Sequence, residues 1–118
     1  MLQQTRASAV EPYYERFLAR FPDLEALARS SEAALLECWS GLGYYSRARN
    51  LRRAAQSVIS DMGGKLPETA AQLAALPGVG PYTAAAVASI AFGEPAAVLD
   101  GNVARVMARL ANHRGDVR

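Results

Sequence analysis

Apolar residues recur along this 118-residue chain at the three- and four-residue spacing of amphipathic helices. The spacing and the breaker residues between segments predict helices over about 10–21, 23–28, 31–39, 49–62, 69–76, 82–92 and 100–110. The chain has no alternating run long enough for a strand, and the weak stretch 96–99 is expected to be an extended connection. The pattern predicts an all-α fold in one domain, residues 1–118, without linkers or repeats.

Two of the predicted helices have distinctive patterns. Residues 82–92 are apolar nearly all round, which predicts the central and most buried helix. Asp100 is expected to cap the last helix, with Arg105 and Arg109 facing solvent. The residues of that helix expected to face inward are Val103, Val106, Met107 and Leu110.

The helices at 69–76 and 82–92 are joined by Leu76-Pro77-Gly78-Val79-Gly80-Pro81-Tyr82-Thr83, which can prolong neither of them. Gly78 and Gly80 lack a Cβ, so their backbone can adopt positive φ and approach a ligand closely. Pro81 suits the first turn of the following helix. We expect a helix-hairpin-helix whose free amide N–H groups bind phosphate, although an ordinary interhelical turn also explains the stretch.

A second cluster is Gly41-Leu42-Gly43-Tyr44-Tyr45-Ser46-Arg47-Ala48-Arg49. Its apolar and aromatic side chains followed by arginines are typical of a surface that inserts into a base stack and holds phosphates. The alternative is a helix C-cap with the tyrosines in the core. At the N-terminus, Gln3, Gln4 and Thr5 would present side chains to base edges, which a polar helix end explains equally well.

Asp100 follows the apolar run Ala96–Leu99 and precedes Gly101-Asn102, about a helix length beyond the hairpin. The helix at 82–92 would bring this carboxylate back towards the phosphate-binding turn. On local sequence alone, a helix N-cap is the favoured interpretation of this residue. The two interpretations are compatible, because a capping carboxylate can also face a cleft.

Composition narrows the function classes. The formal charge is only +2, but every basic residue except Lys65 is arginine, which suits phosphate recognition and stacking on bases. One cysteine excludes a disulfide framework and a four-cysteine metal site within these residues, and Cys38 is expected to be a buried small hydrophobe. His113 is expected at the surface. No signal peptide or membrane-spanning run is visible, so we expect a soluble, cytoplasmic protein without a membrane partner.

Four stretches together resemble a known family. Met1–Thr5, Gly41–Leu51, Leu76–Thr83 and Leu99–Val103 occur in the same order and at similar spacing in MutY-type adenine DNA glycosylases. The resemblance covers nearly the whole chain. It implies an all-helical bundle or barrel lobe of the helix-hairpin-helix DNA glycosylase fold, with the hairpin motif at about 69–92.

The resemblance implies base excision repair by a monofunctional enzyme, a hydrolase of N-glycosyl bonds. It would act as a monomer in the bacterial cytoplasm, at the nucleoid. Its partner would be double-stranded DNA in which adenine faces 8-oxoguanine or guanine. Asp100 matches the carboxylate that stabilises the cationic sugar, and Tyr82 and Asn102 match residues that help to orient it. Tyr82 occupies the position of the Schiff-base lysine of bifunctional relatives, which favours base removal without strand cleavage.

The DNA-contacting residues also follow from the resemblance. Gln4 and Tyr44 match side chains that insert into the duplex, with Leu42 alongside and with Gln3, Thr5 and Arg47 as neighbouring contacts. The hairpin amides of Gly78, Val79 and Gly80 would bind backbone phosphate, with a cation at Gly78 and Val79. No other metal or cofactor is expected within this chain.

Two departures from the family pattern qualify this reading. The family's proton-donating glutamic acid lies just upstream of the stretch that begins at Met1, and its four iron–sulfur cysteines would fall after Arg118. We therefore expect a fragment or short form with weakened or lost catalysis, and an iron–sulfur cluster only in the full-length family. The alternative is a non-catalytic helix-hairpin-helix module that binds DNA through the hairpin and the arginine face, with Asp100 only a cap.

Overall fold

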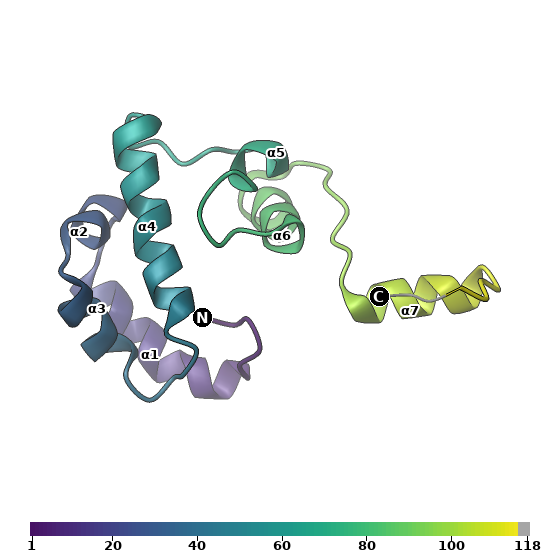
Figure 1. Cartoon of the computed structure of the whole chain (residues 1–118), viewed down its shortest axis with the longest axis horizontal. Helices are drawn as coiled ribbons and strands as arrows, with labels where there is room; N and C mark the ends of the chain where they lie inside the picture. The colour runs from purple at the N-terminus through teal and green to yellow at the C-terminus, as the bar shows by residue number, and fades with distance from the viewer. Residues whose placement is uncertain (116–118) are drawn as a thin grey trace. The chain divides into compact units, whose positions relative to one another are not determined.

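The computed structural model describes residues 1–115, and these contain helices and connections but no strand, which confirms the all-α prediction. Figure 1 shows the helices in chain order. They are α1 (Ala7–Arg20), α2 (Leu24–Arg29), α3 (Glu32–Trp39), α4 (Ser46–Asp61), α5 (Ala70–Leu73), α6 (Pro81–Phe92) and α7 (Gly101–Leu110). The chain divides into two compact units. The first unit contains Met1–Pro67 and Leu76–Gly78, and the second contains Glu68–Ala75 and the chain from Val79 onward.

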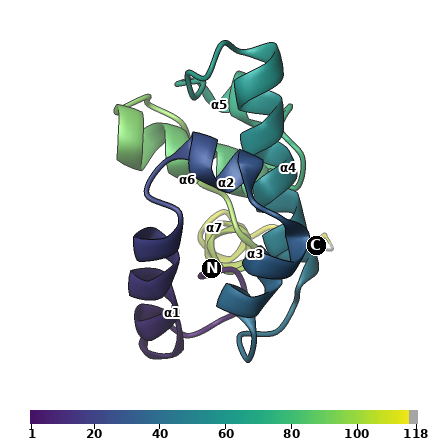
Figure 2. The same cartoon turned by 90° about the vertical axis from the view of Figure 1, so that its left-hand side faces the viewer.

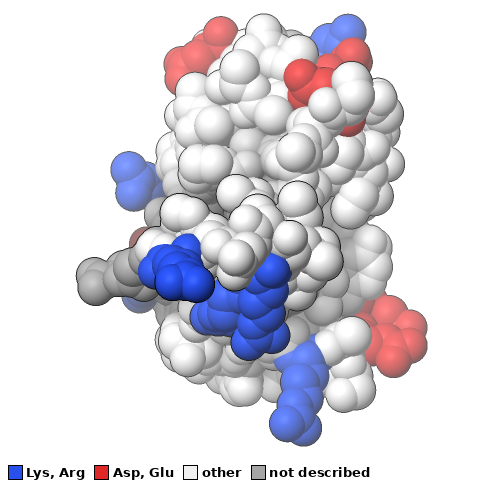
Figure 3. All heavy atoms as spheres, turned by 90° about the vertical axis from the view of Figure 1, so that its right-hand side faces the viewer, with Lys and Arg blue, Asp and Glu red and all other residues white. Residues whose placement is uncertain are grey.

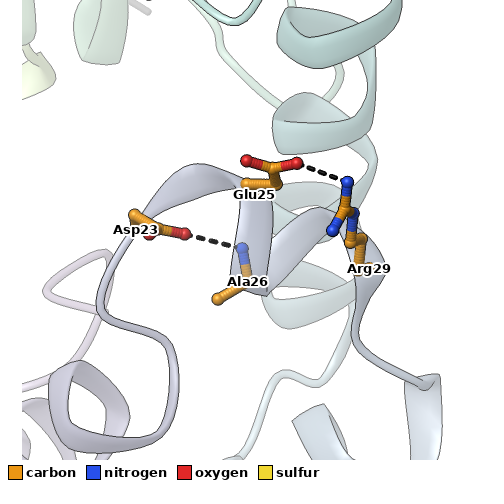
Figure 4. Close-up of polar contacts among 4 residues, drawn as sticks. All are labelled: Asp23, Glu25, Ala26 and Arg29. Carbon is orange, nitrogen blue, oxygen red and sulfur yellow. Dashed lines mark hydrogen bonds and ion pairs between the residues drawn. The ribbon is translucent and has the colours of Figure 1, made fainter.

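Short polar side chains cap two helices of the first unit, α2 and α3. The Asp23 carboxylate accepts a hydrogen bond from the Ala26 N–H at 2.7 Å and so caps α2 (Figure 4). The same figure shows the exposed ion pair of Glu25 with Arg29, one turn apart on that helix. Such surface pairs contribute well under about 1 kcal/mol, so the cap is the stronger local determinant.

The core of the first unit is built around α3. Leu35 and Trp39 are fully buried on this helix, and the Phe17 ring of α1 meets Trp39 edge-on with 6.2 Å between ring centroids. α3 packs against both α1 and α4, which Figure 2 shows from the side. On α4 the apolar side chains of Ala54, Ala55 and Val58 are buried, whereas those of Leu51 and Ile59 are exposed.

The polar stripe of α4 contacts the connection between α2 and α3. Arg52 Nε donates to the Ser30 carbonyl at 2.7 Å, and Gln56 Nε2 donates to the Ala28 carbonyl at 3.2 Å. These carbonyls end α2 and have no partner within that helix, so α4 supplies their donors. Arg49 forms an ion pair with Glu32 at 2.8 Å. Arg49 and Arg52 of α4 therefore contact the protein itself.

In the second unit α5 packs against α6. α5 ends at Leu73, before the predicted end at Leu76, and the Glu94 carboxylate accepts a hydrogen bond from the Ala70 N–H at its start at 2.6 Å. The prediction that α6 is the most buried helix is wrong. Its buried residues are only Ala84, Ala85 and Ala88, and Ile90 is 85% exposed.

The expectation that the apolar face of α7 turns inward is also wrong. No residue of this helix is buried, and the side chains at Val103, Val106, Met107 and Leu110 are all exposed. Arg105 and Arg109 are exposed, as predicted. Basic side chains stand out in Figure 3 on a face whose other atoms are mostly uncharged. Among the described residues, no helix is long and apolar enough to cross a membrane.

Candidate DNA-binding site

The hairpin presents its backbone at the start of α6. Pro81 is the first helical residue and Gly80 the N-cap, whose carbonyl accepts from the Ala84 N–H at 2.9 Å. In the described structure no side chain caps this end. Gly78 and Gly80 are exposed, and a Cβ at Gly80 would meet nothing within 4 Å. An open helix N-terminus of this kind suits an anionic group such as phosphate.

The two hairpin glycines have different roles. Gly78 has φ +73°, and a Cβ there would lie 2.5 Å from the Asn50 Cβ of α4, closer than non-bonded carbon atoms can approach. Gly80 has φ −82°, so the prediction of positive φ holds for Gly78 and is wrong for Gly80. Asn50, which sequence reasoning did not single out, packs against the turn at Gly78.

Gln4 and Tyr44, the side chains predicted to insert into DNA, share an unusual backbone. Gln4 has φ +54° and Tyr44 has φ +48°. A residue with a Cβ in this left-handed region costs roughly 1–2 kcal/mol, and such positions cluster at functional sites. Both side chains are exposed, Tyr44 at 63%. The alternative that placed the tyrosines in the core is therefore wrong.

Leu42, the third residue predicted to contact DNA here, is placed differently. It is 8% exposed and belongs to the core cluster of the first unit. A buried side chain does not reach a base stack without moving out of that core. The structure therefore does not place Leu42 for the predicted insertion. Its apolar character serves packing instead.

Arg47, predicted to contact DNA, binds the protein itself. One terminal guanidinium nitrogen donates to the Met1 carbonyl at 2.7 Å, to the Thr5 Oγ1 at 2.9 Å and to the Gln3 carbonyl. The other donates to the Gly43 carbonyl at 3.2 Å. Burial, and secondarily the nearby guanidinium, lower the pKa of the Met1 amine below its ordinary value. Arg47 therefore joins the two stretches that carry Gln4 and Tyr44.

The predicted catalytic residues occupy helix N-termini in the second unit. The Asp100 carboxylate accepts from the Val103 N–H at 2.7 Å, which confirms its capping role. Asn102 is exposed and accepts from Arg105 at 2.8 Å, and Tyr82 is 48% exposed near the start of α6. Within the described residues, no hydrogen bond joins Asp100 to Tyr82 or Asn102. Their catalytic roles stay predictions.

Metal ligands do not gather in the described part of the chain. It contains no group of three or more His, Cys, Asp and Glu side chains arranged to hold a metal ion. The single cysteine, Cys38, is half-buried on α3. One thiol cannot supply the ligands of a four-cysteine iron–sulfur cluster, so the residues present do not fit that group.

The uncapped N-terminus of α6 and the exposed, left-handed residues Gln4 and Tyr44 are the features of this helical chain that a DNA-binding protein could use. Residues 1–117 match the family described as HhH-GPD superfamily base excision DNA repair protein, and the chain belongs to this family. It is 50% identical to the adenine DNA glycosylase of Homo sapiens over 93% of the chain and 20% of that relative. It is 43% identical to the adenine DNA glycosylase of Buchnera aphidicola subsp. Baizongia pistaciae over 92% of the chain and 31% of that relative.

Solved structures agree with the fold. The chain superposes on a trapped covalent endonuclease III–DNA intermediate with a TM-score of 0.86 at 29% identity, covering 98% of this chain and 56% of that one. A thermostable thymine-DNA glycosylase gives 0.82 at 34% identity, covering 90% and 49%. The chain therefore spans about a fifth to a third of these two curated relatives and about half of the solved structures.

Proposed function

We propose that this chain recognises adenine mispairs in double-stranded DNA and takes part in hydrolysis of the adenine N-glycosidic bond. Membership of a base excision repair family and 50% identity to an adenine DNA glycosylase support the proposal. The observation that carries it is the exposed pair Gln4 and Tyr44. Both have left-handed backbone, and Arg47 contacts the residues on either side of Gln4 and the ring of Tyr44.

Binding would begin with the DNA backbone. The amides of Val79 and Gly80, ahead of α6, would donate main-chain hydrogen bonds to a phosphate, and the helix dipole would favour its negative charge. A contact of this kind carries no sequence information and fixes the register of the protein on the duplex. A cation at Gly78 and Val79 would add positive charge at the same turn.

Recognition of the mispair would use the exposed insertion residues. Extruding a base requires a few kcal/mol of unstacking and unpairing, and less at a mispair than at a matched pair. The Tyr44 ring offers an aromatic face that can replace the lost stacking, and the Gln4 amide can hydrogen-bond to base edges. Selectivity for a mispair over a matched pair follows from the smaller cost of opening it.

The chemical step would depend on Asp100. As the bond from the sugar C1′ to adenine breaks, its electron pair leaves with the base and positive charge develops on the sugar. A carboxylate placed there stabilises that charge. Water then adds at C1′ and loses a proton, the departing adenine gains one, and the products are an abasic site and free adenine. Tyr82 supports hydrolysis without strand cleavage, because a phenol forms no imine with the sugar.

The rival function is a DNA-binding module without catalysis. It is favoured by the capping role of Asp100, which needs no chemistry to explain it. The arginines that such a module would use to bind DNA are partly engaged within the protein, however. Arg49 contacts Glu32, and Arg52 contacts the Ser30 carbonyl.

Fluorescence anisotropy on two matched duplexes separates the functions. One duplex carries adenine opposite 8-oxoguanine and the other carries adenine opposite thymine. The proposed function predicts at least about tenfold tighter binding to the mispair, and Tyr44→Ala should remove most of the difference. Equal affinity of the wild-type chain for both duplexes would contradict the proposal and support the binding module.

A further inference from the structure

Gln4 and Tyr44 lie 40 positions apart in the sequence but depend on one side chain. Each adopts a backbone conformation that L-residues rarely hold without surrounding constraints. Neither residue lies within a helix, so helical hydrogen bonding does not impose these conformations. Local turn bonds contribute, since the Arg47 N–H donates to the Tyr44 carbonyl at 3.0 Å, and side-chain contacts of Arg47 add constraints at both segments.

Arg47 supplies contacts on both sides of Gln4. Its guanidinium donates to the Gln3 carbonyl and to the Thr5 Oγ1, the residues immediately before and after Gln4, and to the Met1 carbonyl. The Thr5 N–H also donates to the Leu2 carbonyl at 3.3 Å. These bonds close a short turn with Gln4 at its tip.

The same guanidinium fixes the Tyr44 segment. It donates to the Gly43 carbonyl, which also accepts from Trp39 Nε1 at 3.1 Å. The carbon of the guanidinium lies 5.4 Å from the Tyr44 ring centroid and 5.6 Å from that of the fully buried Trp39, within cation–π range of both. Trp39 thus anchors Arg47 to the core, and Arg47 orients Tyr44.

We propose that Arg47 is a positioning residue that holds Gln4 and Tyr44 in one fixed presentation for insertion at the mispair. The inference rests on the proposed function and replaces the predicted DNA contact by Arg47. Fixing both segments before binding removes the ordering cost that flexible segments would incur on the DNA. Lysine cannot replace the planar fork that reaches carbonyls on both segments, so charge alone does not suffice.

A positioning role of Arg47 and a direct contact between Arg47 and phosphate predict different effects on DNA binding when the side chain is lost. Loss of a phosphate contact weakens binding to every duplex about equally and reduces the salt slope by about one. Loss of a positioning residue weakens binding to the mispair, leaves binding to the matched duplex unchanged and does not alter the salt slope.

The test combines two readouts on Arg47→Lys and Arg47→Ala. Tyr44→Ala serves as the reference for lost insertion, and Arg20→Ala, at an exposed site on α1, is the control for one lost charge. The first readout is the fluorescence of 2-aminopurine replacing the adenine opposite 8-oxoguanine, which rises when the base unstacks. The second is hydrogen exchange of the amides at 4–6 and 44–46 in the free chain.

We expect Arg47→Lys to lower the 2-aminopurine signal to the Tyr44→Ala level and to raise exchange at both segments by about tenfold or more, while Arg20→Ala changes neither. Unchanged exchange, a salt slope reduced by one, or loss of the folded circular dichroism spectrum in both Arg47 variants would overturn the proposal. If Tyr44→Ala leaves the 2-aminopurine signal unchanged, the proposed insertion fails, and the exchange readout still decides whether Arg47 positions the segments.

Discussion

Replacing Gly78 by alanine tests whether the hairpin is held against α4. The residue has φ +73°, and an L-residue in this region costs roughly 1–2 kcal/mol. The new Cβ would also lie 2.5 Å from the Asn50 Cβ and 2.8 Å from its Cγ. A Cβ cannot rotate away, so the backbone of the turn or of α4 must shift, at about 1–3 kcal/mol.

We therefore expect Gly78→Ala to lower the free energy of unfolding by roughly 2–5 kcal/mol, the sum of these two contributions. Urea denaturation followed by circular dichroism measures the change. Gly80→Ala is the matched control, because Gly80 has φ −82° and open space around it, and it should change stability by less than about 1 kcal/mol.

A second variant separates the two contributions. Asn50→Gly removes the atom that the new Cβ would meet, so in this background Gly78→Ala should retain only the backbone strain of roughly 1–2 kcal/mol. Equal destabilisation by Gly78→Ala and Gly80→Ala would refute the reasoning. Equal destabilisation by Gly78→Ala in the wild-type chain and in the Asn50→Gly background would refute it too.

Three further predictions concern α4, the DNA backbone and the sugar. Arg52→Ala removes the donor to the Ser30 carbonyl and should lower the free energy of unfolding, measured by urea denaturation, by about 1–2 kcal/mol. The control Arg53→Ala, at an exposed position, should lower it by less than about 0.5 kcal/mol. Equal losses would contradict the contact. If the hairpin binds phosphate mainly through amides, as proposed, log–log plots of duplex affinity against salt should have a slope no steeper than about −3. A steeper slope would favour binding through arginines. Tyr82→Lys should form an imine with a preformed abasic site, detected as a borohydride-trapped adduct, and no adduct would argue against a position beside the sugar.

Local chemistry made much of the fold predictable. Asp23, Ser31, Thr69 and Asp100 each cap the helix that follows, and each capping bond joins residues only three positions apart. Pro81 begins α6 for an equally local reason. The helix order and most boundaries therefore follow from short stretches of sequence.

The burial of α6 and α7 could not be predicted in the same way. Periodicity shows which side chains share a helix face, as it does for Val103 and Met107, but it does not show whether another element covers that face. The exposure of Ile90 has the same cause, since an apolar helix is buried only where partners surround it.

Candidate site residues could be proposed from the sequence, but the backbone geometry and contacts around them could not. Motif spacing identified Gln4 and Tyr44, but no sequence signal assigns positive φ to residues other than glycine and asparagine. The role of Arg47 depends on carbonyls more than 40 residues away in the chain, which only tertiary structure brings within reach. The same applies to Asn50, whose contact with Gly78 joins distant segments.

The central claim is that Asp100 stabilises positive charge on the sugar, and cationic sugar analogues test it most directly. Two duplexes place 8-oxoguanine opposite an abasic analogue, either a cationic pyrrolidine or a neutral tetrahydrofuran. Opposite charges about 4 Å apart interact by roughly 4 kcal/mol near a protein surface, and partial exposure of Asp100 reduces this. The wild-type chain should prefer the cation by about 10- to 100-fold.

Asp100→Asn keeps a capping oxygen and removes the charge, so the fold should be retained. We predict that this variant binds both analogues equally, with an unfolding midpoint close to that of the wild-type chain. An undiminished preference for the cationic analogue in Asp100→Asn would contradict the account.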